Sequence, residues 1–278
     1  MLQRMIKNKF FLIGSILAFI IVLFSIFSPL IIRFDPIAIS LTGKLTPPEG
    51  FSRGLDSHIL GTDQMGRDIF ARLLIGSRYS LIIATLVVFI AGFIGVSLGI
   101  IAGYTGKAVD AVIMRICDVF LSVPNIVLAI SVMAILGTNM RNLVAVLIAS
   151  SWVQYCRITR NNVLVIKNME FVQASKVMGS STLKIMFHQI FPNITTPMLI
   201  ALSQQFGHTI LTEAALSFLN LGIQPPIPSW GNMIANGRSY LVTYPWMVFA
   251  PGIALMVTVL AFNFLGDGLR DVLDPKRD

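Results

Sequence analysis

Three carboxylates fall at or inside long apolar stretches of this 278-residue chain, namely Asp118, Glu213 and Asp267. A charged group in hydrocarbon is costly, so such residues often mark a functional site. Asp118 and Asp267 lie close to the ends of their stretches, where interfacial water or a lysine partner accounts for them. Glu213 lies near the far end of its stretch. Two interpretations of Glu213 stay open: it lines or gates a pathway, or it makes an interfacial hydrogen bond.

The histidines and cysteines form no recognisable site. His58, His188 and His208 fall in three different parts of the chain, and no pair of them has metal-ligand spacing. The 13 methionines are common core filler, so we expect no metal site. Cys117 and Cys156 lie at or within apolar stretches, and their spacing matches neither a metal site nor a disulfide framework. We expect them to be packing residues.

No phosphate-binding loop occurs in the chain. The glycine–lysine pairs at 43–44 and 106–107 lack the rest of that pattern. The chain therefore has no means of using ATP, and we expect no cofactor bound to it. The few polar side chains are scattered, whereas an enzyme would gather them near one interface.

Composition identifies the elements that carry these residues. Hydrophobic residues make up 55% of the chain and charged residues 12%, where a soluble domain has about 25% charged residues. Five stretches have no Asp, Glu, Lys or Arg and exceed the roughly 20 residues that cross a bilayer: Phe10–Ile32, Tyr79–Gly106, Val119–Met140, Ile185–Thr212 and Ser239–Gly266. A shorter one, Asn142–Cys156, spans if its helix continues past Arg157 and Arg160. The sequence predicts an all-α, polytopic membrane protein with about six transmembrane helices, one of them kinked at Pro124.

The net charge of +8 is explained by topology. With both termini in the cytoplasm, that side holds 13 of the 21 basic residues, as the positive-inside rule requires: Arg4, Lys7, Lys9, Lys107, Arg115, Arg157, Arg160, Lys167, Lys176, Lys184, Arg270, Lys276 and Arg277. Nucleic-acid binding would need a basic face on a soluble domain, and the sequence offers none. The predicted organisation is a cytoplasmic N-terminus (1–9), a first span (10–32), an outer segment (33–78), a membrane core (79–266) with a cytoplasmic loop (157–193), and a cytoplasmic tail (267–278).

The cytoplasmic loop is polar and basic, with Glu170 as its one acid. Gly179 is suited to end a short helix, because glycine takes the left-handed conformation readily. Pro192 is suited to the first turn of the next helix. A stiff helix here could pass force from a partner to the spans. The alternative is an amphipathic helix that lies on lipid headgroups.

Several segments resemble the permeases of ATP-binding cassette (ABC) importers, in the group that carries dipeptides, oligopeptides and nickel. The central loop, with Gln173, Ala174, Ser175 and Gly179, is similar to the family's Glu-Ala-Ala…Gly loop. Three further segments are similar to the family in the same order: His58–Leu81 (beginning HILGTDQMGRD), Ser217–Gly231 (SFLNLGIQPPIPSWG) and Gly266–Pro275 (GDGLRDVLDP). The early loop and the tail resemble the second, "C"-type subunit of the group.

The resemblance implies a fold, a set of partners and a site. It implies a type I ABC importer permease fold in a bacterial or archaeal cell membrane. The implied partners are a related permease as heterodimer, two ATPase subunits that bind the ATP, an extracytoplasmic binding protein and membrane lipid. The ATPase-coupling residues would be Glu170, Gln173, Ala174, Ser175, Gly179 and Pro192. The chain departs from the family pattern at three positions. Gln173 and Ser175 replace the glutamate and the second alanine of Glu-Ala-Ala, and Asn220 replaces a glycine.

The transported substrate would be a peptide, or nickel or another metal chelate. Two other functions remain to be tested against this one. An ion-coupled secondary transporter would show an internal repeat or broken helices at the membrane midplane, and no clear repeat is seen. A polytopic membrane enzyme would show clustered catalytic groups.

Overall fold

The computed structural model describes residues 8–52 and 54–273. The secondary structure of these residues is helical, apart from one isolated β-bridge between Thr62 and Asp68. The α-helices are α2 (Lys9–Ile31), α3 (Ile69–Thr105), α4 (Lys107–Leu121), α5 (Asn125–Leu136), α6 (Met140–Ile166), α7 (Glu170–Val177), α8 (Thr182–Ile185), α9 (Phe191–Phe218), α10 (Trp230–Gly237) and α11 (Trp246–Leu273). Short 3₁₀ turns lie at Gly54–Asp56 and Arg238–Tyr240, and a π-helical turn lies at Met186–Ile190. Arg4, Lys7, Lys276 and Arg277, which entered the charge count, lie outside the described residues.

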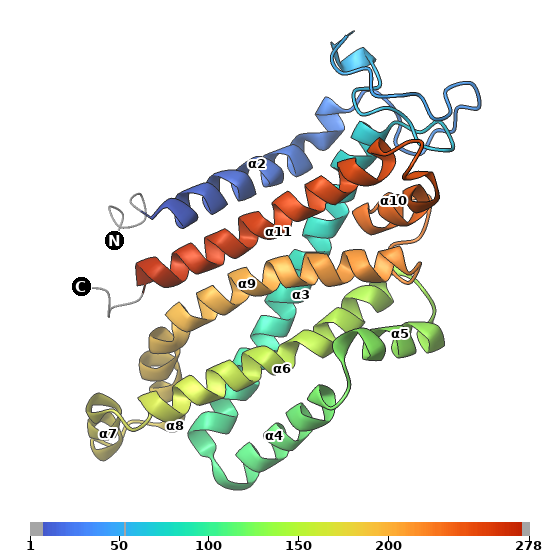
Figure 1. The fold of residues 1–278 in the computed structure, drawn as a ribbon. Helices are drawn as coiled ribbons and strands as arrows, with labels where there is room; N and C mark the ends of the chain where they lie inside the picture. The colour runs from blue at the N-terminus through green and yellow to red at the C-terminus, as the bar shows by residue number, and fades with distance from the viewer. Residues whose placement is uncertain (1–7, 53, 274–278) are drawn as a thin grey trace.

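The long helices run side by side in the order α2, α11, α9 and α6, and α3 crosses behind them (Figure 1). The start of α2 and the end of α11 lie at the same end of the bundle as α7 and α8. The segment between α2 and α3 lies at the other end with α10. The chain therefore separates the basic loop from the predicted outer segment by the length of the bundle.

Four of the described helices are long and apolar enough to cross a membrane: α2, α3, the continuous helical segment Thr182–Phe218, and α11. The pair α4 and α5 forms a fifth candidate, bent by 82°. By position the sixth is α6, which continues past Arg157 and Arg160 as predicted. The prediction of an all-helical membrane protein with about six spans is confirmed.

Several helix boundaries differ from the sequence-based expectation. The third span begins at Lys107 and not at Val119, and the sixth runs from Trp246 to Leu273, so it starts after Ser239 and extends into the predicted tail. The second span begins at Ile69, within the predicted outer segment, because the Asp68 side chain caps α3 by accepting a hydrogen bond from the Ala71 N–H at 2.7 Å. The third span is broken rather than kinked at Pro124. Proline lacks an N–H and forces the preceding residue out of the helical region, so α4 stops at Leu121 and α5 starts after the proline.

Helices α3 and α6 form the most extensive contact in the bundle, through glycines. Gly95, Gly99 and Gly103 face α6, and a Cβ added at Gly99 would lie 2.6 Å from the Thr159 Cβ and 2.6 Å from the Cys156 carbonyl oxygen. Lipid offers no hydrophobic drive for helix association, so close backbone packing of this kind holds the spans together.

Helix α4 is tied to α6 by two ion pairs. The Arg160 guanidinium donates to both carboxylate oxygens of Asp110, at 2.9 and 2.5 Å. The Arg157 guanidinium donates to Asp118. Sequence reasoning assigned interfacial water or a lysine to Asp118, and its actual partner is an arginine in α6. Both arginines were expected at the start of the cytoplasmic loop, just beyond the predicted span, and α6 continues through them to Ile166.

Candidate functional site

The predicted helix of the basic loop is α7, and it ends at the predicted glycine. Gly179 has φ +81°, and its N–H donates to the Lys176 carbonyl at 3.1 Å, while the Ser180 N–H donates to the Ser175 carbonyl at 3.1 Å. These two bonds close a helix through a left-handed residue. Glu170 is the first residue of α7, where a carboxylate interacts favourably with the helix dipole.

Helix α7 has one buried side and one exposed apolar side. Val172 is 2% exposed and packs in a core cluster with Ile166 and Ile185, and Ser175 is 4% exposed. We call the opposite side the α7 outer face; it consists of Phe171 (44% exposed), Ala174, Val177 (88%) and Met178 (79%). A contiguous exposed apolar surface at the end of a bundle is typical of a site for another protein.

Gln173, which stands where the family has glutamate, bonds within its own chain. Its side-chain N–H donates to the Lys167 carbonyl at 2.8 Å. A carboxylate could not donate this bond. The Lys167 ammonium in turn donates to the Gly103 carbonyl at 2.6 Å, close to the end of α3. The loop is therefore tied to the ends of both α6 and α3.

Pro192 lies in the first turn of α9, as predicted, but α9 continues a helical segment that begins before it. The chain is helical from Thr182 to Phe218, and α8 passes into α9 through the π-helical turn, in which the Phe191 N–H donates to the Met186 carbonyl. Proline has no N–H and crowds the preceding turn of a helix, which accounts for a widened turn just before it. Helix α8 is therefore continuous with a candidate membrane span.

Glu213 is fully buried (0% exposed) between α9 and α3. One carboxylate oxygen accepts from the Ser80 hydroxyl at 2.9 Å, and the other accepts from the Ser217 hydroxyl at 2.7 Å. The Ser217 oxygen also accepts from the Ile223 N–H at 3.2 Å. In this chain Glu213 joins two spans to the loop that follows α9.

The conformation of the loop that follows α9 accounts for several residues of the Ser217–Gly231 segment. A Cβ at Gly222 would collide with Ser217, so only glycine fits there. Asn220 has φ +61°, a conformation that asparagine tolerates better than other non-glycine residues, which accounts for its place where the family has glycine. The Trp230 indole N–H donates to the Leu73 carbonyl at 3.0 Å and anchors the loop on α3.

The charged residues of the motif that begins at His58, before α3, form a buried network. Asp63 accepts from the Arg67 guanidinium at 2.7 Å and lies 3.6 Å from that of Arg72. Arg72 also donates to the Pro36 carbonyl at 2.9 Å. His58 Nδ1 lies 2.8 Å from the Asp68 carboxylate. These contacts fold the predicted outer segment onto the start of α3.

The structure keeps the three histidines apart, and the described residues contain no group of three or more His, Cys, Asp or Glu side chains that could hold a metal. Cys117 and Cys156 are free, buried and part of one packing cluster, as predicted. Sequence reasoning missed a polar face on α9 that includes His208. The signal for it was present, because Gln204, His208 and Thr212 recur at intervals of four residues.

Comparisons with known proteins agree with this architecture. The family described as "Binding-protein-dependent transport system inner membrane component" matches residues 95–278, and the "N-terminal TM domain of oligopeptide transport permease C" matches residues 1–48. The chain is 38% identical to the dipeptide transport system permease protein DppC of Haemophilus influenzae, over 97% of this chain and 92% of that one. It is 39% identical to the di/tripeptide permease DppC of Pseudomonas aeruginosa (99% and 90%) and 44% identical to the glutathione permease GsiD of Pectobacterium atrosepticum (79% and 73%).

Such permeases are transport components rather than enzymes, and the apolar helices fit a multi-pass protein of the inner membrane. The family match therefore decides against both the secondary transporter and the membrane enzyme. The chain belongs to the inner-membrane permeases of binding-protein-dependent ABC importers, as a subunit of the C type.

Proposed function

We propose that this permease carries small peptides into the cell. Its relatives are named for dipeptides, di- and tripeptides and glutathione, and these names favour a peptide over nickel or a metal chelate. A related permease would form the other half of the pathway as a heterodimer. An extracytoplasmic binding protein would deliver the peptide to the pair.

ATP would be bound by two separate ATPase subunits, and the chain would need no cofactor of its own. The coupling segment would be Glu170 to Pro192, which includes Gln173, Ala174, Ser175 and Gly179. The observation that supports it most is the two-sided construction of α7: Val172 and Ser175 anchor it to the bundle, while the α7 outer face is exposed and apolar. An ATPase that binds this face would move α7 and, through α8, the span α9.

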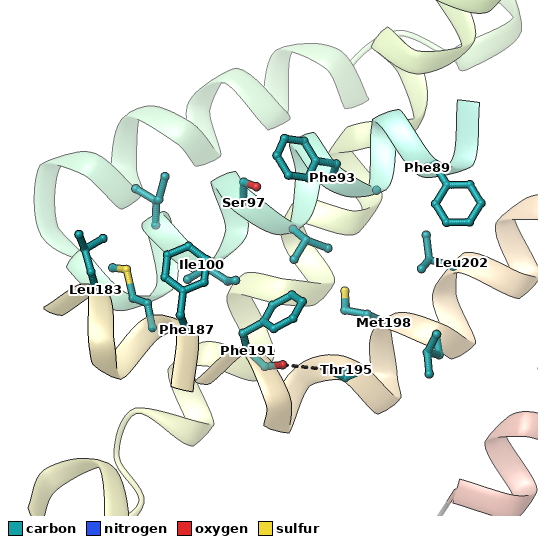
Figure 2. Close-up of a pocket in the computed structure, with 15 residues that line it drawn as sticks. Phe89, Phe93, Ser97, Ile100, Leu183, Phe187, Phe191, Thr195, Met198 and Leu202 are labelled. Carbon is teal, nitrogen blue, oxygen red and sulfur yellow. Dashed lines mark hydrogen bonds between the residues drawn. The ribbon is translucent and has the colours of Figure 1, made fainter. Parts of the chain in front are cut away.

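The topology we propose places both termini and the 157–193 loop in the cytoplasm. Transport would occur by rocking of the two permease halves between inward- and outward-open states. Lipid would cover the apolar sides of the bundle. One such side is a groove of about 540 Å³ between α3 and the α8–α9 segment, lined by side chains such as Phe93, Phe187 and Met198 (Figure 2).

A pair of matched substitutions tests the coupling. Val177→Asp places a charge on the α7 outer face, and Val242→Asp places one on a similarly exposed valine (88% and 97%, respectively) at the other end of the bundle. In the complex reconstituted with its partner permease, ATPases and binding protein, Val177→Asp should abolish co-purification of the ATPases and ATP-driven peptide uptake. Val242→Asp should leave the ATPases bound. Equal ATPase retention by both variants would remove α7 from the coupling site.

A further inference from the structure

The least apolar of the four long candidate spans carries α9. The most apolar 18-residue stretch of the segment Thr182–Phe218 has a mean hydropathy of 1.2, against 2.1 to 2.9 for the corresponding stretches of α2, α3 and α11. Its polar residues include Gln204, Gln205, His208 and Thr212, which lie near the middle of α9. A helix of 28 residues is longer than the roughly 20 that cross the hydrocarbon, so its middle lies deep in the membrane.

Neighbouring helices cover three sides of α9. Gln205 is buried against α6, where its side-chain N–H reaches the Ser151 hydroxyl oxygen at 3.4 Å. Leu202 faces Gly92 of α3. Gly207 faces α11, as an added Cβ there would lie 3.1 Å from the Asn263 side-chain oxygen. The side left uncovered in this chain is that of His208 and Thr212. Gln204 lies at the edge of this side, where its side-chain N–H donates to the Asp267 carboxylate of α11 at 3.1 Å.

Helix α6 extends this uncovered polar side. Ser150 and Gln154 flank the buried Ser151, and Gln154 is exposed, as are Gln204 and His208. Helices α6 and α9 lie side by side with α3 behind both of them (Figure 1). Exposed residues beside the α6–α9 contact therefore lie on the side away from α3. We call Ser150, Gln154, Gln204, His208 and Thr212 the polar stripe.

Lipid is a poor cover for Gln154 and His208 of the polar stripe, whereas the Ser150 and Thr212 hydroxyls donate to carbonyls of their own helices, those of Leu147 and His208. Hydrogen-bonding groups exposed to hydrocarbon have no partners there, and such a surface is costly. The sides of the bundle that suit lipid look different, because α3 exposes Phe89 (64%) and Phe93 (76%) beside the apolar groove of Figure 2. Along α9, the small residues Ala201 and Ala215 flank the polar ones.

We propose that the polar stripe lines the water-filled peptide pathway, that the related permease supplies the facing wall, and that His208 contacts the peptide in transit. This rests on the proposed function. The five side chains of the stripe are uncharged donors and acceptors, which match the amides of a peptide backbone, and the Asp267 carboxylate lies beside Gln204 at the edge towards α11. His208 is oriented from its own helix: Nδ1 lies 3.5 Å from Gln205 Nε2 and 3.5 Å from Thr212 Oγ1. Both contacts use Nδ1, so Nε2 is the nitrogen that meets the pathway.

Cysteine accessibility tests the pathway directly. In a background where Cys117 and Cys156 are replaced, His208→Cys and Gln154→Cys are exposed to a charged, water-soluble methanethiosulfonate in the assembled complex in vesicles. Matched controls are Phe93→Cys on the lipid side and Ile210→Cys, fully buried (0% exposed) on the same helix. The stripe positions should react at least about tenfold faster than either control, because only a hydrated thiolate reacts. Stripe rates equal to that of Phe93→Cys would overturn the pathway assignment.

Uptake assays then test His208 itself. His208→Leu should raise the KM for peptide uptake or lower its rate, while the ATPases remain bound and His208→Gln, which keeps a donor and an acceptor, restores uptake. Unchanged uptake by His208→Leu would overturn its role as a peptide contact. These outcomes are separate from the proposed function, which fails only if the unmodified complex takes up no peptide.

Discussion

Replacing Gly179 tests the coupling loop most sharply, because the site isolates one physical effect. The residue has φ +81° and nothing within 4 Å of an added Cβ. A side chain would therefore meet no neighbour, and its cost arises from the backbone conformation alone. For an ordinary L-residue the left-handed conformation costs about 1–2 kcal/mol, and a β-branched residue is disfavoured further. Asparagine is the non-glycine residue that tolerates it best.

The cost should appear in coupling and not in folding. The Gly179 turn lies at an exposed end of the bundle, so a loss of about 1–2 kcal/mol leaves most of a stability of about 5–15 kcal/mol intact. The same loss in the turn would lower the ratio of correctly placed to displaced α7 by about 5- to 30-fold. ATPase affinity and peptide uptake should fall in Gly179→Val by at most these factors, because both depend on the correctly placed fraction.

The assay is ATPase binding to the permease pair in lipid nanodiscs, with peptide uptake measured in parallel vesicles. Affinity should decrease in the order wild type, Gly179→Asn, Gly179→Ala, Gly179→Val, with the asparagine variant close to wild type. Wild-type affinity and uptake in Gly179→Val would remove the loop from the mechanism. An equal loss in the asparagine and valine variants would show that backbone conformation is not the cause.

Three further predictions concern the spans and the topology. Gly99→Ala should destabilise the detergent-purified protein by about 1–3 kcal/mol through overpacking against α6, whereas Gly252→Ala, with nothing within 4 Å, should not lower the melting temperature; equal melting temperatures would refute the tight α3–α6 contact. Glu213→Gln should keep uptake and ATPase within about twofold of wild type, because a neutral amide also bonds hydroxyls, and a large loss of uptake in an assembled complex would restore a gate role. A cysteine at Ser52 should be labelled from outside and one at Ser181 spared, and strong outside labelling at Ser181 would refute the proposed topology.

Features decided by local physics could be predicted from the sequence. Uncharged runs of about 20 residues predict spans whatever their neighbours, and the family resemblance was read from segments along the chain. The end of α7 was predictable because a glycine after a short polar helix adopts positive φ for reasons within one turn. The break at Pro124 was predicted only as a kink, since the 82° angle depends on what α4 and α5 pack against.

The roles of individual polar residues were decided by tertiary structure. Glu213 has an unremarkable neighbourhood in the sequence, and its partner Ser80 is 133 residues away. Asp110 and Arg160 are 50 residues apart and form a bidentate pair. A polar group at membrane depth must find a partner or water, but which of these it finds depends on how the helices assemble. The sequence therefore determined what kind of protein this is and where the proposed coupling helix lies, while only the packed bundle showed that Glu213 is enclosed and that His208 is not.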